Sequence, residues 1–143
     1  MLTSSLKKKI TKKMLSALAL AVFCGGCATG GQTSVAETEK IVLNRAQMRW
    51  DLLLSRKIDK AYDYLSPASK ETTTMVDYIA RVSRVQGLTE VKVDAVKCEE
   101  ERCKVDFVAL GAIRNITGIE RQFSEFWIKA DGNWWNVYNG RQP

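Results

Sequence analysis

Two cysteines separated by four residues are the first side chains whose type and spacing could do chemistry. Cys98 and Cys103 flank the acidic run Glu99–Glu101 between two predicted strands, so a hairpin would place them opposite each other. A metal site would need further Cys or His ligands, and the chain has no histidine. A redox pair usually has the C-x-x-C spacing. The pattern therefore favours a structural disulfide, formed after export to an oxidising compartment.

The amino terminus has the pattern of an export signal. A lysine-rich segment, 1–13, precedes an apolar run of ten residues, Met14–Phe23. Because a membrane-spanning helix needs about 20 apolar residues, a run of this length is typical of the apolar region of a signal peptide and not of a permanent anchor. We expect residues 1–26 to be removed.

The residues that follow resemble the lipobox of bacterial lipoproteins, in which small residues precede a cysteine that is acylated and becomes the new amino terminus. Gly25 and Gly26 fit this pattern and make Cys27 the lipidated residue, whereas Cys24 departs from the Leu, Val or Ala usual at its position. Ordinary secretion with cleavage near Ala28 is the alternative. The resemblance to Gram-negative lipoproteins implies palmitate on Cys27 and, without an Asp after it, a periplasm-facing location in the outer membrane.

The mature chain divides into a tether and one domain. Residues 28–38 are small and polar and follow Cys27 as a flexible tether, whose average reach is about 18 Å. The remaining residues, 39–143, are enough for a single hydrophobic core. The expected partner of the tether is the membrane, through its lipid.

The net charge argues against a nucleic-acid-binding protein. The chain has 22 Lys and Arg against 16 Asp and Glu, a net charge of +6. Five of the lysines lie in the segment to be removed, which has no acidic residue, so the mature chain keeps a charge of +1. This near-balance gives no electrostatic support for binding nucleic acid.

Capping residues and apolar spacing predict three helices in the first half of the domain. The first runs from Ser34, which opens an S-x-x-E capping box, to about Arg56; the second runs from Asp59 to Tyr64; the third follows Thr74. Proline at position 67 starts a further turn between the last two. The apolar stripes are Val42, Ala46, Trp50 and Leu53 in the first helix and Met75, Tyr78, Ile79 and Val82 in the third.

The second half of the domain alternates with the period of strands. Four antiparallel strands are predicted, near 91–95, 104–110, 122–130 and 134–138. Helices followed by strands give an α+β fold, with three N-terminal helices packed on a curved antiparallel sheet of about four strands.

The dipeptide Asp131–Gly132 sets the register of the last two strands, because it favours a two-residue hairpin turn. One face of the hairpin then pairs Ile128 with Trp135 and Phe126 with Val137. The opposite face pairs Lys129 with Trp134, Trp127 with Asn136, and Glu125 with Tyr138. Since the first set is wholly apolar, we expect it to face the helices.

Two stretches of the domain resemble nuclear transport factor 2-like domains, which have a cone-shaped, cystatin-like fold. They are RWDLL at 49–53 followed by DKAYDYLSP at 59–67, and the closing DGNWW at 131–135. The resemblance covers residues 39–139 and implies a pocket between helices and curved sheet. The scaffold hosts enzymes, binding modules and assembly domains alike, so it implies a fold more than a function.

Some members, such as ketosteroid isomerases, carry an acid or base and a tyrosine inside that pocket. The resemblance makes Asp106 and Glu125 the candidate carboxylates and Tyr62, Tyr64 and Tyr78 the candidate hydroxyls, although the catalytic pattern does not match residue by residue. The alternative is that the carboxylates lie on solvated strand faces and the tyrosines belong to the core. Without a paired acid and base in the sequence, we expect neither catalysis nor a cofactor.

Two functions follow as hypotheses. The first is a non-catalytic, lipid-anchored interaction module that binds an envelope protein or a second copy through an aromatic outer sheet face. That face would consist of Phe123, Trp127, Trp134 and Tyr138. The second is a small-molecule-binding protein or, less favoured, an enzyme similar to ketosteroid isomerases. Its pocket would be lined by Trp50, Tyr62, Tyr78 and Phe126.

Overall fold

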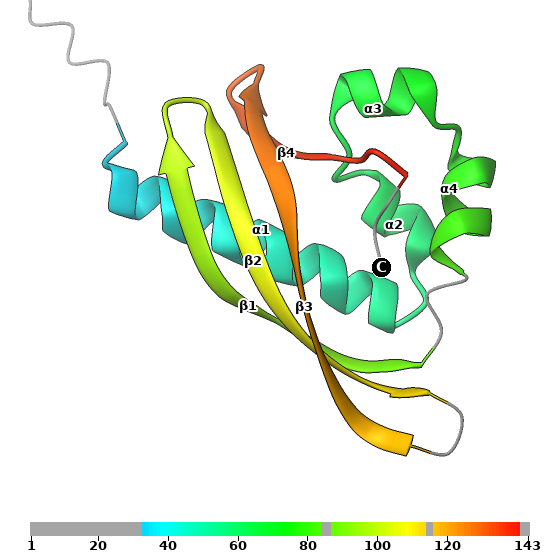
Figure 1. The fold of residues 1–143 in the computed structure, drawn as a ribbon. Helices are drawn as coiled ribbons and strands as arrows, with labels where there is room; N and C mark the ends of the chain where they lie inside the picture. The colour runs from blue at the N-terminus through cyan, green and yellow to red at the C-terminus, as the bar shows by residue number, and fades with distance from the viewer. Residues whose placement is uncertain (1–32, 84–86, 114–115, 141–143) are drawn as a thin grey trace, which may run out of the picture. The chain divides into compact units, whose positions relative to one another are not determined.

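A computed structural model describes residues 33–83, 87–113 and 116–140 (Figure 1). They belong to one of the two units into which the chain divides, Gln32–Pro143. The predicted signal peptide, the predicted lipidation site Cys27 and most of the predicted tether lie outside the described residues. Within the described ranges, no helix has the length and apolar character needed to cross a membrane.

Capping hydroxyls begin three of the helices. The helices are α1 (Val35–Leu54), α2 (Ile58–Tyr62), α3 (Pro67–Thr72) and α4 (Met75–Val82). Ser34, Ser66 and Thr74 each accept a hydrogen bond from the backbone N–H three residues later, as expected of N-cap residues. The predicted cap Asp59 is wrong, because α2 begins after Lys57 and Asp59 lies in its first turn. The turn predicted at residue 67 continues as α3, so the described part of the chain has four helices and not three.

The strands form one antiparallel sheet, as predicted. They are β1 (Leu88–Glu99), β2 (Arg102–Ile113), β3 (Ile116–Ala130) and β4 (Asn133–Val137), in the order β1-β2-β3-β4. Figure 1 shows α1 crossing one face of this sheet. The shorter helices α2, α3 and α4 are grouped beyond the carboxyl end of α1. The α+β class is therefore confirmed.

The closing hairpin has the predicted register. Ile128 lies opposite Trp135, and Trp127 lies opposite Asn136. Both turn residues have positive φ, 51° at Asp131 and 74° at Gly132, which is the backbone of the tight turn that this dipeptide favours. The pairing stops one residue early, because the N–H of Tyr138 donates to the Ser69 hydroxyl instead of continuing the strand.

The two faces of the hairpin are the reverse of the prediction. The face that packs on the helices, called the inner face here, carries the buried Glu125, Trp127, Trp134, Asn136 and Tyr138. The outer face carries Phe126, which is 39% exposed, and the partly exposed Ile128, Trp135 and Val137. The inner face buries two indoles and a tyrosine ring, whereas the outer face has one indole and one phenyl ring. The polar members of the inner face find partners there, so burying them costs little.

The β1–β2 hairpin is closed by the predicted disulfide. Cys98 and Cys103 are directly opposite each other in the register and are joined through their sulfur atoms. Cys103 is fully buried and belongs to the hydrophobic core, whereas Cys98 is partly buried. The bridge therefore fixes the end of the hairpin and contributes to the core.

Candidate functional site

A buried carboxylate is the centre of the polar groups on the inner face. Oε1 of Glu125 accepts hydrogen bonds from Nη1 of Arg49 at 2.9 Å and from Nε1 of Trp50 at 3.0 Å. Its Oε2 accepts from Nδ2 of Asn136 at 2.9 Å. Nη2 of Arg49 also donates to the hydroxyl of Tyr78 at 3.0 Å. Helix α1, helix α4 and strands β3 and β4 thus meet at one ion pair.

Burial and charge act against each other in this network. Burial raises the pKa of Glu125, and the charge of Arg49 and the N–H groups of Trp50 and Trp127 offset only part of that rise. Burial lowers the pKa of Arg49, but Glu125 and Tyr78 outweigh it and leave that pKa raised. Among the described atoms, Nε1 of Trp127 has no partner in hydrogen-bonding geometry, and it lowers the pKa of Glu125 less than Arg49 and Trp50 do. Arg49 therefore stays charged, and its role here is to compensate the carboxylate.

The two candidate carboxylates do not form an acid–base pair. Asp106 lies on the outer face, where it accepts a hydrogen bond from the Ser124 hydroxyl and pairs with Nζ of Lys104 at 2.7 Å. These two hydrogen bonds lower the pKa of Asp106. The alternative of a solvated carboxylate thus holds for Asp106, but it is wrong for Glu125, which is buried and fully engaged. No group of acidic or cysteine side chains in the described ranges could hold a metal ion.

The residues predicted to line a pocket do not share one. Trp50 and Tyr78 are buried in the core, and the rings of Tyr62 and Tyr78 are 5.5 Å apart. Phe126 lies on the other face of the sheet, under the guanidinium of Arg102 at 4.3 Å. The space beside Trp50 is filled by aromatic rings, since its centroid lies 5.1 Å from that of Phe123. The interior of the domain is therefore packed with side chains at the place where the resemblance implied a pocket.

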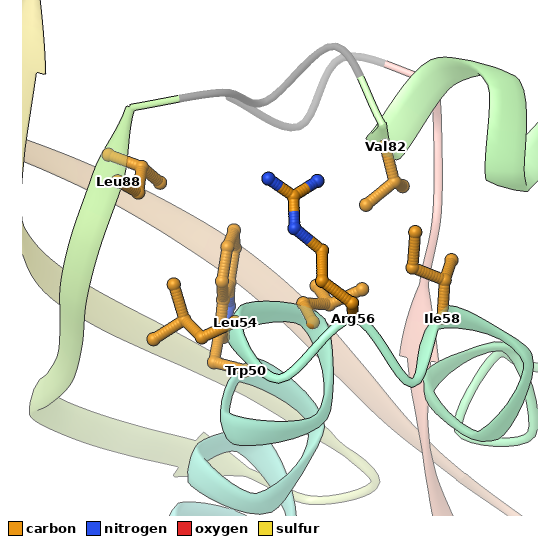
Figure 2. A pocket seen from close by; sticks show the side chains of 7 residues that line it. Trp50, Leu54, Arg56, Ile58, Val82 and Leu88 are labelled. Atoms are coloured by element: carbon orange, nitrogen blue, oxygen red, sulfur yellow. The ribbon is translucent and has the colours of Figure 1, made fainter.

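A small pocket opens at the carboxyl end of α1 (Figure 2). Its volume is about 50 Å³, well below the roughly 300–1,000 Å³ of small-molecule sites. Figure 2 shows the side chain of Arg56 standing between Leu88 and Val82, among apolar neighbours. The lining residues are Trp50, Leu53, Leu54, Arg56, Ile58, Val82 and Leu88.

A cluster of cations and aromatic rings lies on the surface beside β4, and we call it the Arg45 cluster. The guanidinium carbon of Arg45 is 5.0 Å from the ring centre of Tyr64 and 5.7 Å from that of Trp135. Nζ of Lys70 is 5.6 Å from the same Trp135 ring and 5.5 Å from that of Tyr62. All five side chains are partly exposed. Residues from α1, α2, α3 and β4 and from the segment after α2 therefore form one mixed surface.

Among the residues that the structure describes, the cations of the Arg45 cluster have no acidic partner. Nε of Arg45 donates to the carbonyl of Trp134 at 2.9 Å, and Nζ of Lys70 donates to that of Asp63 at 3.2 Å. Neither forms an ion pair with any residue that the structure describes. Burial lowers the pKa of Arg45, and the nearby Tyr64 only partly restores it. The cluster thus presents positive charge that a ligand or partner could neutralise.

The sequence did not reveal this cluster, and all four predicted interface residues lie elsewhere. Trp127, Trp134 and Tyr138 are buried under the helices, and Phe123 packs against the core. The prediction of an exposed aromatic face made of these residues is therefore wrong. The aromatic residue of β4 that does reach the surface is Trp135, and its cationic neighbours come from helices far away in the sequence.

Comparison with known proteins gives similarities of fold only. No protein-family model matches the chain, and no curated protein matches it. A solved structure described as an NTF2-like transpeptidase from Campylobacter jejuni is 14% identical, with a TM-score of 0.47 over 67% of this chain and 96% of that chain. A SEC-C motif-containing protein from Rhodopseudomonas palustris is 18% identical, with a TM-score of 0.48 over 66% of this chain and 73% of that chain.

Proposed function

We propose that this protein is a non-catalytic interaction module of the bacterial cell envelope, anchored by a lipid on Cys27, that binds a partner protein through the Arg45 cluster. The observation that carries the proposal is a pair of cations that have no acidic partner in the described ranges and lie over three partly exposed rings. Arg, Trp and Tyr are the residues most enriched where protein interfaces concentrate their binding energy.

The surface next to the cluster supports the same function. Ile41 and Met48 are 41% and 55% exposed. They lie four residues before and three residues after Arg45, so they share its side of α1. A partner that fits this surface would offer carboxylates to Arg45 and Lys70 and apolar side chains to α1.

The interior of the domain also favours binding over catalysis. Glu125 is buried, and its two oxygens accept three hydrogen bonds from side chains of the domain itself. A general base must instead reach a substrate proton directly or through one water. Asp106, the other candidate, is on the opposite face of the sheet. These positions support an architectural role for both carboxylates.

Site-specific photo-crosslinking in cells that express the full chain would test the proposal. A crosslinker at position 48 should form an adduct of one defined mass, because that position borders the cluster. A crosslinker at position 92, exposed on β1, is the matched control and should form none. The double variant Arg45→Ala with Trp135→Ala should abolish the adduct, whereas Lys129→Ala should retain it. Cys27→Ala should remove the protein from the membrane fraction.

Two results would contradict the proposal. Equal adducts from positions 48 and 92 would mean that the crosslinks are non-specific. An adduct that persists in the Arg45→Ala, Trp135→Ala variant would mean that the partner binds elsewhere. An adduct with twice the mass of the chain would identify the partner as a second copy.

A further inference from the structure

The free edge of β1 is covered by side chains of α1. The amide of Gln47 donates to the carbonyl of Val91 at 2.9 Å and accepts from the N–H of Val93 at 3.0 Å. Further along, Glu39 accepts from the N–H of Cys98 at 3.2 Å. Because these backbone groups are already satisfied, β1 is a poor template for another strand.

The free edge of β4 is occupied as well. The N–H of Asn136 donates to the carbonyl of Tyr64, and the carbonyl of Asn136 accepts from the N–H of Ser66, both at 2.8 Å. Arg45 donates to the carbonyl of Trp134. The segment that follows α2 therefore lies along β4 as a short parallel bridge.

The first ten residues of β3, by contrast, are paired on one side only. Ile116–Glu125 pairs with β2, while β4 pairs only with Phe126–Ala130. Figure 1 shows β3 running well past the end of β4. Among the described residues, nothing else bonds to the backbone of these ten residues. The open edge is about 33 Å long, at roughly 3.3 Å per residue.

Side chains along this edge specify what could pair with it. On the inner face, the exposed Arg121 stands between the partly buried Ile119 and Phe123. Phe123 is held there by stacking on Phe107, its direct neighbour in the sheet, at 5.0 Å. An incoming strand would place every second side chain on this face, so the best match is an acidic residue between two apolar ones.

We infer that the edge Ile116–Glu125 accepts an extended segment of a partner protein, in which an acidic residue facing Arg121 is flanked by apolar residues. The segment would add a fifth strand to the sheet, along the part of the β3 edge that does not pair with β4. A second copy is a poorer occupant, because pairing two β3 edges about Arg121 would set like charges directly opposite each other. This site is distinct from the Arg45 cluster and does not depend on it.

A short peptide probe tests the inference on the full-length protein purified in detergent. The probe is acetyl-Thr-Val-Thr-Glu-Thr-Val-Thr-amide, and its control has lysine in place of glutamate. The measurement is amide hydrogen exchange over 116–125 as a function of peptide concentration. The acidic peptide should slow exchange there, and it should bind more tightly than the control by roughly threefold or more, as expected for one cross-strand charge pair.

Charge reversal on the protein identifies the residue responsible. Arg121→Glu should invert the preference, so that the lysine peptide binds better, whereas Lys129→Glu, on the part of β3 that β4 covers, should leave the preference unchanged. If Arg121→Glu does not fold, Arg121→Gln should still abolish the preference. The Arg45→Ala variant should bind the peptide like the unaltered protein, which separates failure of this site from failure of the Arg45 cluster.

Three results would overturn the inference. The first is no slowing of exchange by the acidic peptide at about 1 mM. The second is a preference that Arg121→Glu leaves unchanged. The third is a dimer in sedimentation whose 116–125 amides are protected without peptide, since the occupant would then be a second copy.

Discussion

The two faces of the β3–β4 hairpin alternate along the same two strands, yet they differ in which side chains they bury. The inner face buries two tryptophans together with a glutamate and an asparagine, whereas the outer face leaves four apolar side chains half covered. On the outer face, long cationic side chains shelter the rings, as Arg102 does over Phe126 and Arg45 and Lys70 do over Trp135.

The difference shows that hydrophobicity alone does not decide which side of a strand is buried. A polar side chain can be buried at low cost when a partner on another element satisfies it. Here Arg49 provides that partner for Glu125. An apolar side chain can stay outside when the aliphatic stems of Lys and Arg cover it.

The largest effect on stability is expected when the inner-face carboxylate is removed. Glu125→Ala should lower the free energy of unfolding by about 3–5 kcal/mol, because it leaves Arg49 charged and buried without its partner. Its outer-face neighbour is the matched control, and Phe126→Ala should cost only about 1 kcal/mol because that ring is partly exposed. Urea denaturation would measure both values.

Replacing both members of the ion pair sharpens the same test. Arg49→Met combined with Glu125→Leu should recover most of the loss, since two apolar side chains leave no buried charge unpaired. A double variant as unstable as Glu125→Ala would show that packing at this site, and not charge, sets the cost.

A smaller effect is expected from trimming one tryptophan on each face. Trp127→Phe should cost roughly 1–3 kcal/mol, because a fully buried indole leaves a cavity that the core cannot close. Trp135→Phe should change stability by at most about 0.5 kcal/mol, as at other surface positions, since phenylalanine keeps a ring beside the two cations. Thermal unfolding of the two variants is the measurement, and equal losses would refute the assignment of faces.

The smallest effect is the pH dependence, for which the two faces should have opposite signs. The pKa of Glu125 is raised by burial, so its contribution to stability is present below its ordinary value of 4.5 and is lost as the pH rises through the raised pKa. The pKa of Asp106 is lowered by its hydrogen bonds, so its contribution is present above 3.8 and is lost as the pH falls through the lowered pKa.

Two neutral variants make these signs measurable by urea unfolding at several pH values. From acid to neutral pH, Glu125→Gln should gain stability relative to the unaltered protein, whereas Asp106→Asn should lose a little. Because Asp106 lies partly exposed on the outer face, its effect should be small and should weaken with salt. If both variants gained stability, or both lost it, relative to the unaltered protein between acid and neutral pH, the predicted opposite signs would be wrong.

The features that the sequence predicted correctly depend on neighbouring residues. Ser34 and Thr74 accept bonds from amides three residues away, and Asp131–Gly132 forms a two-residue turn. Cys98 and Cys103 are opposed because a tight hairpin leaves them no other arrangement. In each case the physical cause lies within a few residues of its effect, so a local pattern is sufficient.

The features that it missed depend on residues far apart in the chain. Arg49 and Glu125 are separated by 76 positions, and Arg45 meets the carbonyl of Trp134 across 89 positions. A single sequence carries no local sign of such pairs. Because the sequence does not show that Arg49 pairs with Glu125, it predicts that Glu125 is exposed to solvent. That prediction places the wrong face of the hairpin toward the helices.

Gln47 restricts what mutation can do to helix α1. Its side-chain amide serves a carbonyl and an N–H of β1 at once, in the way that a neighbouring strand would. A glutamate there could accept but not donate, and a methionine of similar length could do neither. The position therefore tolerates few substitutions, although it is not in the core. A substitution at position 47 that helix packing alone would allow could still leave the edge of β1 free to pair with other chains. Such a variant would aggregate although its fold is retained.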